Sequence, residues 1–359
     1  MFQLHLFTDQ LCRLHSPGMG HPERPERLDA VTAVFDSCDG KPGVTIDPGR
    51  DATDAEITAV HTAALLERVR DSQQREITVF DADTVANSHS CAAALRAAGS
   101  ACAAVDALFS GQAQRAFVGT RPPGHHAEAD RPMGFCFFNN AAIAAEHARR
   151  HHGVSRIAIV DWDVHHGNGT MHSFYADPGV LYVSLHQFPL FPGSGRLEET
   201  GSAEGTGYTL NLPLAGGRSD NEYLFLFDTL VVPLLDRYQP QLVLISAGFD
   251  AHERDPLGSM LLSDVAFAAM TERLTGVAER HAQGRVAALL EGGYSLYGLE
   301  LGIAATIDSL RGAQRAAPAD ARQSATAAGG SHTIVDSAVE QIAERAADTL
   351  SRQWGRFTV

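Results

Sequence analysis

Three side chains in this sequence have the types and spacing of a metal site. Asp163 and His165 lie two residues apart, so in extended backbone both side chains point the same way. A third carboxylate, Asp250, follows a separate apolar run. One imidazole and two carboxylates suit zinc, which keeps three protein ligands in catalytic sites and leaves room for water; Fe(II) or Co(II) would also fit. The alternative is that the D-x-D-x-H-H segment only caps a helix that begins near Asn168.

Asp161 precedes these residues and has two conceivable roles. It could orient a neighbouring group through hydrogen bonds, or it could bind a monovalent cation together with nearby carbonyl groups. A two-metal site would need further aspartates, and neither D-A-H-x-D nor D-x-D-x-x-D occurs in the right place. We therefore expect one catalytic metal ion.

Two histidines and a tyrosine could move protons and stabilise charge. His125 and His126 follow a Pro-Pro-Gly turn that fixes the backbone. Histidine titrates near neutral pH, so it can take a proton from water and return one to a leaving amine; the alternative is that both histidines bind the metal. Tyr294 follows two glycines, and its phenol could donate a hydrogen bond to an oxyanion. The alternative for Tyr294 is a packed loop aromatic.

Two loop aromatics could form a narrow slot for an aliphatic chain such as a lysine stem. Phe135 lies in an unusually aromatic segment, and Phe191 lies in a loop rich in proline and glycine. The alternative is an ordinary core position, which suits Phe137 and Phe138 better.

Short apolar runs predict the buried strands that must position these residues, and apolar residues at three- and four-residue spacing predict helices between them. The predicted strands are 3–8, 115–119, 156–161, 180–186, 209–213, 241–247 and 285–291. The predicted helices are 25–35, 88–109, 139–150, 220–237, 263–281 and 295–310. Strands that alternate with helices imply an α/β fold with a parallel sheet covered on both faces.

The polar clusters directly follow four of the predicted strands. Ligands of open α/β sheets bind outside the carboxyl ends of the strands, so we expect these clusters to form one active-site rim. Neither a repeat nor a linker divides the chain, which predicts a single domain over residues 1–359. Within it, the Ala-, Gly-, Gln- and Ser-rich segment 312–331 predicts a surface loop, and 334–351 predicts a C-terminal helix.

Composition excludes several classes of protein. The formal charge of −15 argues against nucleic-acid binding, because phosphates would be repelled. No stretch approaches ~20 uninterrupted apolar residues, so we expect no membrane span. Five widely spaced cysteines without a C-x-x-C pair suggest a reducing compartment. The first residues lack the pattern of a signal peptide, so we expect a cytoplasmic protein.

Taken together, these residues closely resemble the zinc-dependent histone deacetylase superfamily, in its class II-like bacterial amidohydrolase branch. The resemblance spans most of the chain in family order and leaves out 312–331. The matching stretches are HPERPERL (21–28), RPPGHHAEADRPMGFCFFNNAAIAA (121–145), DWDVHHGNGT (161–170), SLHQFPLFPGSG (184–195), SAGFDAH with DPLG (246–258) and LEGGYSLYGL (290–299).

The resemblance implies an arginase–deacetylase fold, with a central parallel sheet of about eight strands flanked by helices. It also assigns the catalytic roles, with zinc on Asp163, His165 and Asp250, His125 paired with Asp161, His126 as general base and acid, and Tyr294 as hydrogen-bond donor in the transition state. Some relatives pair the second histidine with an acid, where this sequence has Asn168.

Further sites follow from the same resemblance. An acyl-lysine channel is expected at Gly134, Phe135, Phe191 and Leu257. Structural K⁺ ions are expected at two places, one near Asp161, Ser184 and Leu185 and the other near Phe174.

The expected reaction is hydrolysis of the amide of an acylated amine, with acetyl-lysine in a protein or peptide as the preferred substrate. Polyamine-selective relatives carry Glu at the place of Leu257 and narrow their entrance with an insertion that is not evident here. An acetylpolyamine amidohydrolase is therefore the alternative. The non-enzymatic alternative is an inactive acyl-lysine binding protein, and the sequence is compatible with a homo-oligomer.

Overall fold

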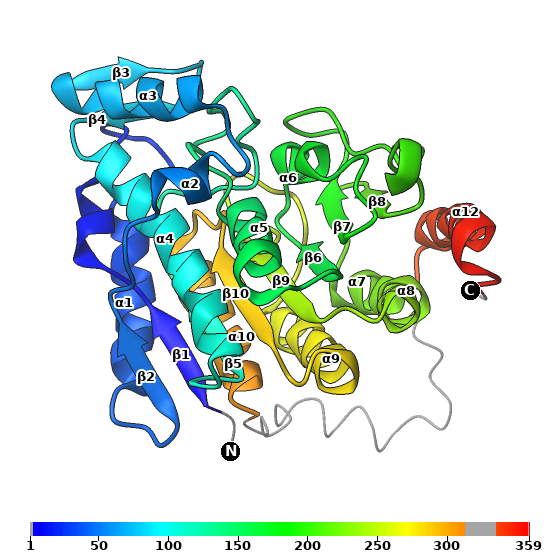
Figure 1. Cartoon of the computed structure of the whole chain (residues 1–359). Helices are drawn as coiled ribbons and strands as arrows, with labels where there is room; N and C mark the ends of the chain where they lie inside the picture. The colour runs from blue at the N-terminus through cyan, green and yellow to red at the C-terminus, as the bar shows by residue number, and fades with distance from the viewer. Residues whose placement is uncertain (1–2, 313–334, 358) are drawn as a thin grey trace.

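A computed structural model of the protein describes residues 3–312, 335–357 and 359. Within these residues, eight parallel strands form one central sheet in the order β2-β1-β5-β10-β9-β6-β7-β8 (Figure 1). The prediction of a parallel sheet of about eight strands is confirmed. The strands are β1 (Leu4–Phe7), β2 (Val44–Asp47), β5 (Arg115–Val118), β6 (Ile157–Asp161), β7 (Val180–Gln187), β8 (Thr209–Leu214), β9 (Leu242–Ala247) and β10 (Val286–Leu290).

All seven strands predicted from apolar runs are present, and β2 is the strand of the central sheet that was missed. It has the sequence Val-Thr-Ile-Asp and lies at one edge of the sheet, where it pairs only with β1. An edge strand is half-exposed, so it needs no continuous apolar run. Its sequence therefore gives a weaker signal than that of the fully buried central strands.

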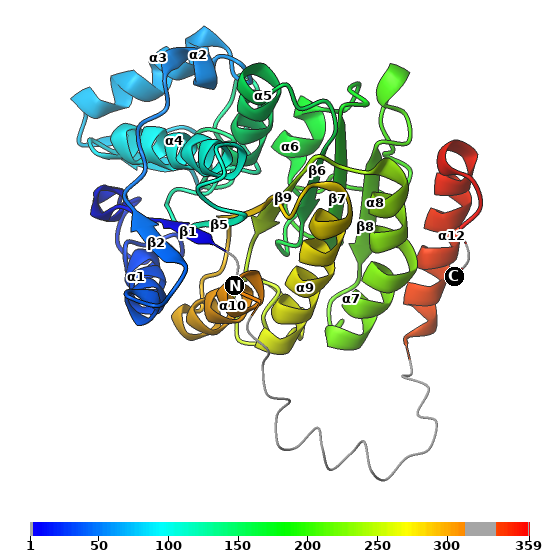
Figure 2. The ribbon, with the colours of Figure 1, turned by 60° about the horizontal axis from the view of Figure 1, so that its bottom comes forward.

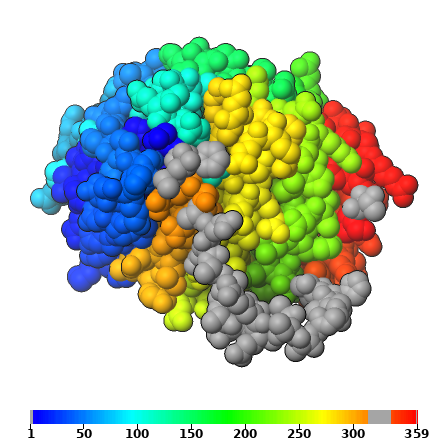
Figure 3. Space-filling model, turned by 90° about the horizontal axis from the view of Figure 1, so that it is seen from below, coloured from blue at the N-terminus to red at the C-terminus, as the bar shows by residue number. Residues whose placement is uncertain are grey.

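Helices cover both faces of the sheet (Figure 2). One face is covered by α4 (Ser90–Phe109) and α5 (Asn140–His152). Figure 3 shows the helices of the opposite layer side by side. These helices are α1 (Glu26–Cys38), α10 (Leu296–Leu310), α9 (Asp264–His281), α7 (Asp220–Leu226), α8 (Val232–Tyr238) and α12 (Ser337–Trp354).

Shorter elements of three to nine residues connect these layers, and the sequence did not predict most of them because such short segments give little periodicity. They are η1 (Gln10–Leu14), α2 (Asp54–Ile57), α3 (Ala63–Asp71), η2 (Ser72–Gln74), the antiparallel pair β3 (Ile77–Val79) and β4 (Val85–Asn87), α6 (Asn168–Ser173) and η3 (Ala203–Gly205).

The predicted helices are confirmed with small shifts at their ends. The helix predicted over 220–237 is interrupted by the π-helical turn η4 (Phe227–Val231), which separates α7 from α8. The C-terminal helix predicted over 334–351 is α12. The surface loop predicted over 312–331 lies, beyond Gly312, outside the described residues.

Helix α4 is long and apolar enough to cross a membrane by length and composition alone. In the structure, 67% of its apolar window is buried inside the protein, where it packs against α5 and strands of the sheet. Burial of this extent is what the core helix of a folded domain shows.

Candidate active site

The predicted functional residues lie on loops that follow β5, β10, β9 and β6, which are adjacent in the sheet. Parallel strands end at the same edge, so these four loops meet there. The residues on them are His125 and His126 after β5, Tyr294 after β10, Asp250 after β9, and Asp163 and His165 after β6.

Asp163, His165 and Asp250 converge as potential metal ligands. One donor atom from each lies within 4.8 Å of the other two. Nδ1 of His165 lies 3.2 Å from Oδ1 of Asp163 and 3.1 Å from Oδ2 of Asp250. Two carboxylate oxygens and one imidazole nitrogen at these separations fit a single zinc ion.

The second oxygen of each carboxylate is held by the backbone. The N–H of Gly292 donates to Oδ2 of Asp163 at 2.8 Å, and the N–H of Val164 donates to Oδ1 of Asp250 at 2.8 Å. A Cβ atom at Gly292 would lie 2.1 Å from Oδ2 of Asp250, so only glycine leaves room for this arrangement. The backbone therefore orients both carboxylates, as the surroundings of metal ligands commonly do.

The alternative that the two aspartates cap a helix is wrong. Helix α6 does begin at Asn168, but its N-cap is Gly167, without a capping side chain. Asp163 instead faces His165.

Burial of these groups creates a strongly coupled electrostatic centre. Burial and repulsion by Asp163 raise the pKa of Asp250 to about 7. Burial alone would lower the pKa of His165, but hydrogen bonds to both carboxylates raise it to about 10. Burial alone would raise the pKa of Asp163, whereas His125 and His165 lower it. Two buried carboxylates that face one imidazole form a site that favours a cation.

His125 and Asp161 form a buried pair. Nδ1 of His125 donates to Oδ2 of Asp161 at 3.0 Å, and that oxygen also accepts a hydrogen bond from Tyr182 at 3.0 Å. Burial alone would lower the pKa of His125, but Asp163 and Asp161 raise it well above its usual range. Asp161 therefore orients His125, the first of its two expected roles.

His126 is paired with a neutral side chain. Its Nδ1 donates to Oδ1 of Asn168 at 2.8 Å, while Nδ2 of Asn168 donates to Oε1 of Glu128 at 2.5 Å. The orientation of the Asn168 amide follows, because Glu128 can only accept. Burial and the neighbouring His125 and His165 lower the pKa of His126 well below its usual range. The lowered pKa favours the neutral imidazole, and no described residue forms a hydrogen bond with its Nε2.

Neither His125 nor His126 belongs to the group of potential metal ligands among the described residues. Nε2 of His125 lies 3.8 Å from Oδ1 of Asp163. The geometry thus favours proton transfer over metal binding for this pair.

Tyr294 and its neighbours are held by contacts with two other segments. Oδ2 of Asp255 accepts from the backbone N–H groups of Tyr294 at 2.6 Å and Ser295 at 3.0 Å. The guanidinium of Arg27 lies 4.9 Å from the centre of the Tyr294 ring and donates to the carbonyls of Gly293 and Glu291. Burial raises the pKa of the Tyr294 phenol well above its usual range, so the phenol keeps its proton and can donate a hydrogen bond.

A cavity of about 180 Å³ opens above these groups. All four residues expected in the substrate channel line it, together with three of the predicted chemical residues. The lining residues are Gly134, Phe135, Phe191, Leu257, His126, His165, Tyr294 and Asp83.

The aromatic residues divide as predicted between cavity and core. The ring of Phe191 lies edge-on to His126, with centres 5.1 Å apart, and the side chain is 40% exposed. The ring of Phe135 lies edge-on to Tyr294 at 5.7 Å. In contrast, Phe137 and Phe138 are fully buried in the core.

Several residues around the site had no predicted role. Glu291 links two of the loops, because its Oε2 accepts from the N–H groups of Gly124 at 2.6 Å and His125 at 3.0 Å. Burial raises the pKa of Glu291 to about 7. Glu291 lies within a stretch that carried the resemblance, as do Glu128, Asp255 and Arg27. Asp83 lies outside every such stretch and had no sequence signal.

Potassium binding at the expected residues remains a prediction. Asp161 and Ser184 are direct partners across strands β6 and β7, and Leu185 follows on β7. Phe174 lies elsewhere, at the end of α6.

Comparisons with known proteins agree with this geometry. The family model for the histone deacetylase domain matches residues 21–310. The chain is 38% identical over 307 residues to a histone deacetylase-like amidohydrolase of Pseudomonas aeruginosa, which covers 80% of this chain and 81% of that protein. It is 39% identical over 290 residues to a probable deacetylase of Archaeoglobus fulgidus, with 79% of each chain covered.

A solved structure extends the similarity to the whole fold. The crystal structure of the HDA15 HD domain superimposes with a TM-score of 0.89 at 34% identity and covers 98% of this chain and 95% of that one. The expected arginase–deacetylase fold is therefore confirmed. This chain belongs to the histone deacetylase family of hydrolytic deacetylases.

Proposed function

We propose that this protein is a zinc-dependent amidohydrolase that removes the acyl group from acylated amines, with acetyl-lysine in peptides or proteins as its substrate. The observation that carries this proposal is the convergence of Asp163, His165 and Asp250 at a cavity that His126 and Tyr294 also line. Metal ligands, a proton acceptor and a hydrogen-bond donor thus face one space.

Zinc held by the three ligands would supply a Lewis acid that polarises the acyl carbonyl and acidifies water. His126 accepts the proton of the attacking water at Nε2, because Nδ1 already donates to Asn168. The phenol of Tyr294 donates to the oxygen on which negative charge develops. The protonated His126 then gives its proton to the departing amine, while Asp161 keeps His125 oriented beside it.

The cavity favours a slender acyl-amine. Phe135 and Phe191 contribute apolar rings to its wall, which suits the methylene chain of a lysine. Leu257 contributes an apolar side chain where an acid would favour a polyamine. The carboxylate of Asp83 offers one acceptor for an N–H group at the same cavity. We therefore place acetyl-lysine before acetylpolyamines; a cytoplasmic location and a homo-oligomer remain predictions.

The test is deacetylation of an acetyl-lysine peptide by the purified protein, with acetylpolyamines and longer acyl-lysines in parallel. We expect turnover of the peptide, loss of turnover after chelation and recovery with Zn²⁺. Turnover that survives complete removal of metal would refute the zinc mechanism. Peptide binding without turnover by the zinc-loaded protein would point to the inactive binding protein, and preference for acetylpolyamines would point to the alternative substrate.

A further inference from the structure

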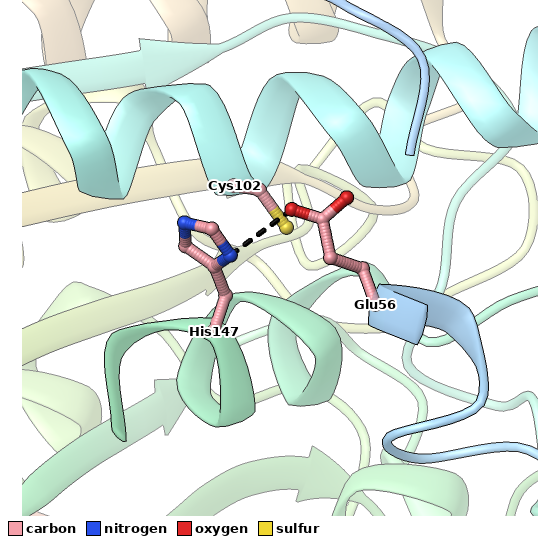
Figure 4. A group of neighbouring side chains, drawn as sticks. All are labelled: Glu56, Cys102 and His147. Atoms are coloured by element: carbon pink, nitrogen blue, oxygen red, sulfur yellow. Dashed lines mark ion pairs between the residues drawn. The ribbon is translucent and has the colours of Figure 1, made fainter. Parts of the chain in front are cut away.

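A second group of potential metal ligands lies between helices α2, α4 and α5, and the cavity beside it shares no lining residue with the active-site cavity. Glu56 of α2, Cys102 of α4 and His147 of α5 point toward one another (Figure 4). One donor atom from each lies within 4.8 Å of the other two. All three residues are buried, with exposed fractions of 8%, 0% and 5%.

Nδ1 of His147 faces this group without a hydrogen bond to any described residue. Its Nε2 donates to Oδ1 of Asp106 at 2.7 Å, and this carboxylate is ionised because hydrogen bonds from His147 and His152 outweigh burial and lower its pKa. Nδ1 of His147 lies 3.0 Å from Oε1 of Glu56 but has no hydrogen-bond partner of suitable geometry among the described residues. A ring nitrogen without a hydrogen bond and a carboxylate oxygen therefore face each other, an arrangement that a bound cation would stabilise.

The hydrogen bond between His147 and the carboxylate of Asp106 is of a kind that metal-bound histidines commonly make. Such histidines usually donate their second ring N–H to a carboxylate or carbonyl, which fixes the ring and raises the basicity of the ligating nitrogen. The pair His147–Asp106 provides this contact. Glu56 is held in a similar way, because Arg50 donates to its two oxygens at 2.6 and 2.9 Å and Thr53 donates its backbone N–H at 2.7 Å.

Cys102 supplies the donor that selects the metal. Thiolate, imidazole and carboxylate are all zinc ligands, with metal–ligand distances of about 2.0–2.3 Å. Tetrahedral geometry at these lengths separates neighbouring donors by roughly 3.3–3.6 Å, close to the separation of Nδ1 of His147 and Oε1 of Glu56. Burial raises the pKa of Cys102, so zinc binding would release the thiol proton, as it does at other cysteine sites.

The charges around these three residues and the access of water to them also suit a zinc ion. Glu56 and Asp106 carry two negative charges against the single positive charge of Arg50, so a thiolate and a divalent cation together would leave the group near neutrality. Gly99 of α4 allows the backbone of Arg50 to approach, since a Cβ atom there would lie 2.1 Å from the Arg50 carbonyl. A cavity of about 410 Å³ borders Arg50, Glu56 and His147, which gives water a route to two of the three ligands.

We propose that Glu56, Cys102 and His147 form a second zinc site, completed by water, that ties α2, α4 and α5 together. This site is separate from the catalytic ligands and stands whether or not the proposed function is correct.

Metal content of the full-length protein tests the proposal. After equilibration with Zn²⁺ and removal of free metal, we expect two zinc ions per chain. Cys102→Ser should retain one, and so should Asp250→Asn, which removes a ligand of the other site. Cys91→Ser is the matched control, because Cys91 is equally buried on α4 but belongs to no ligand group among the described residues; it should retain two.

Replacement of zinc by cobalt tests whether Cys102 binds the metal, independently of the number of zinc ions per chain. The proposed catalytic ligands include no sulfur, so a thiolate-to-cobalt absorption band can report only on a cysteine site. We expect this band in the wild type, Asp250→Asn and Cys91→Ser, and its loss in Cys102→Ser and His147→Gln, with folding verified by circular dichroism. A folded wild type without the band, or a band that persists in Cys102→Ser, would overturn the proposal. One zinc ion per chain without the band would show instead that His147 only links Glu56 and Asp106 and binds no metal.

Discussion

The imidazole of His126 donates through Nδ1 to the amide oxygen of Asn168 at 2.8 Å. The adjacent His125 makes the corresponding hydrogen bond to the carboxylate of Asp161 at 3.0 Å. One histidine is thus paired with a charge and the other with a neutral amide. The nearest carboxylate behind Asn168 belongs to Glu128, which the amide nitrogen contacts at 2.5 Å. Asn168 brings no negative charge to offset burial and the neighbouring His125 and His165, which together lower the pKa of His126.

Substitution Asn168→Asp should therefore impair the enzyme, although an acid occupies this place in some relatives. The second oxygen of the new carboxylate would replace a nitrogen that now donates to Glu128 and to the carbonyl of His126. Two acceptors would then repel it and displace His126. We expect kcat/KM to fall on the order of 10- to 100-fold, the usual effect of losing an orienting partner.

The double substitution Asn168→Asp/Glu128→Gln is the matched rescue. A glutamine amide can donate to the new carboxylate, so most of the lost kcat/KM should return. Equal activity of both variants would show that repulsion by Glu128 is not the cause.

Tyr294→Phe should reduce kcat on the order of 10²- to 10³-fold, because it removes one hydrogen-bond donor to the oxyanion. KM and zinc content should change little, since the ring remains and Tyr294 is not among the proposed ligands. The control is Tyr297→Phe, which removes a phenol hydroxyl from an exposed residue of α10. Steady-state kinetics with an acetyl-lysine peptide measure both kcat and KM. A near-normal kcat in Tyr294→Phe would show that Tyr294 does not take part in the mechanism.

The sequence predicted the central strands and the convergence of the site because both depend on local signals. Fully buried strands require continuous apolar runs, and the polar residues that follow them must lie at the same edge of a parallel sheet. The spacing of Asp163 and His165 was enough to predict that they act together. The prediction that Asp250 joins them also required the inference that its strand belongs to the same sheet. The edge strand β2 lacked such a run and was missed.

Residues that act through distant partners were harder to predict. Glu291 supports His125 across 166 positions of sequence, and Arg27 supports the Gly293 carbonyl across 266. Each residue by itself is only a polar side chain within a stretch that carried the resemblance, and its role is apparent only when the position of its partner is known. The same holds for Glu56, Cys102 and His147, which lie on three separate helices.

Phe191→Ala should weaken substrate binding without destabilising the fold. Its ring is 40% exposed and borders the cavity, so truncation removes contacts with the substrate chain worth about 1–2 kcal/mol. KM should rise roughly 5- to 30-fold, with an unchanged unfolding midpoint in urea. Phe137→Ala is the contrasting variant, because this ring is fully buried; it should cost about 3–5 kcal/mol of stability. A destabilised Phe191→Ala with normal KM would place Phe191 in the core instead.

Glu23→Gln should be among the most destabilising single changes in the protein. The carboxylate is fully buried and accepts from Arg121 at 2.5 and 2.6 Å and from Arg27 at 2.9 Å. Removing its charge leaves two buried guanidinium groups undercompensated, a change that costs about 3–5 kcal/mol. Urea unfolding measures this loss. Glu26→Gln, an exposed position at the start of α1, should stay within about 0.5 kcal/mol of the wild type.

The same carboxylate should make stability depend on pH in the acid range. Burial alone would raise the pKa of Glu23, but Arg121, His15 and Arg27 together lower it well below the ordinary value of 4.5. The unfolded chain therefore takes up this proton at a higher pH than the folded protein does, and the free energy of unfolding decreases as pH falls between the two pKa values. The contribution of Glu23 is complete above about pH 4.5 and is lost as pH falls through the folded pKa. The difference in unfolding free energy between wild type and Glu23→Gln should thus be constant from pH 7 to about pH 5 and shrink at lower pH. A difference that stays constant into the acid range would mean that Glu23 is not held as a carboxylate by these arginines.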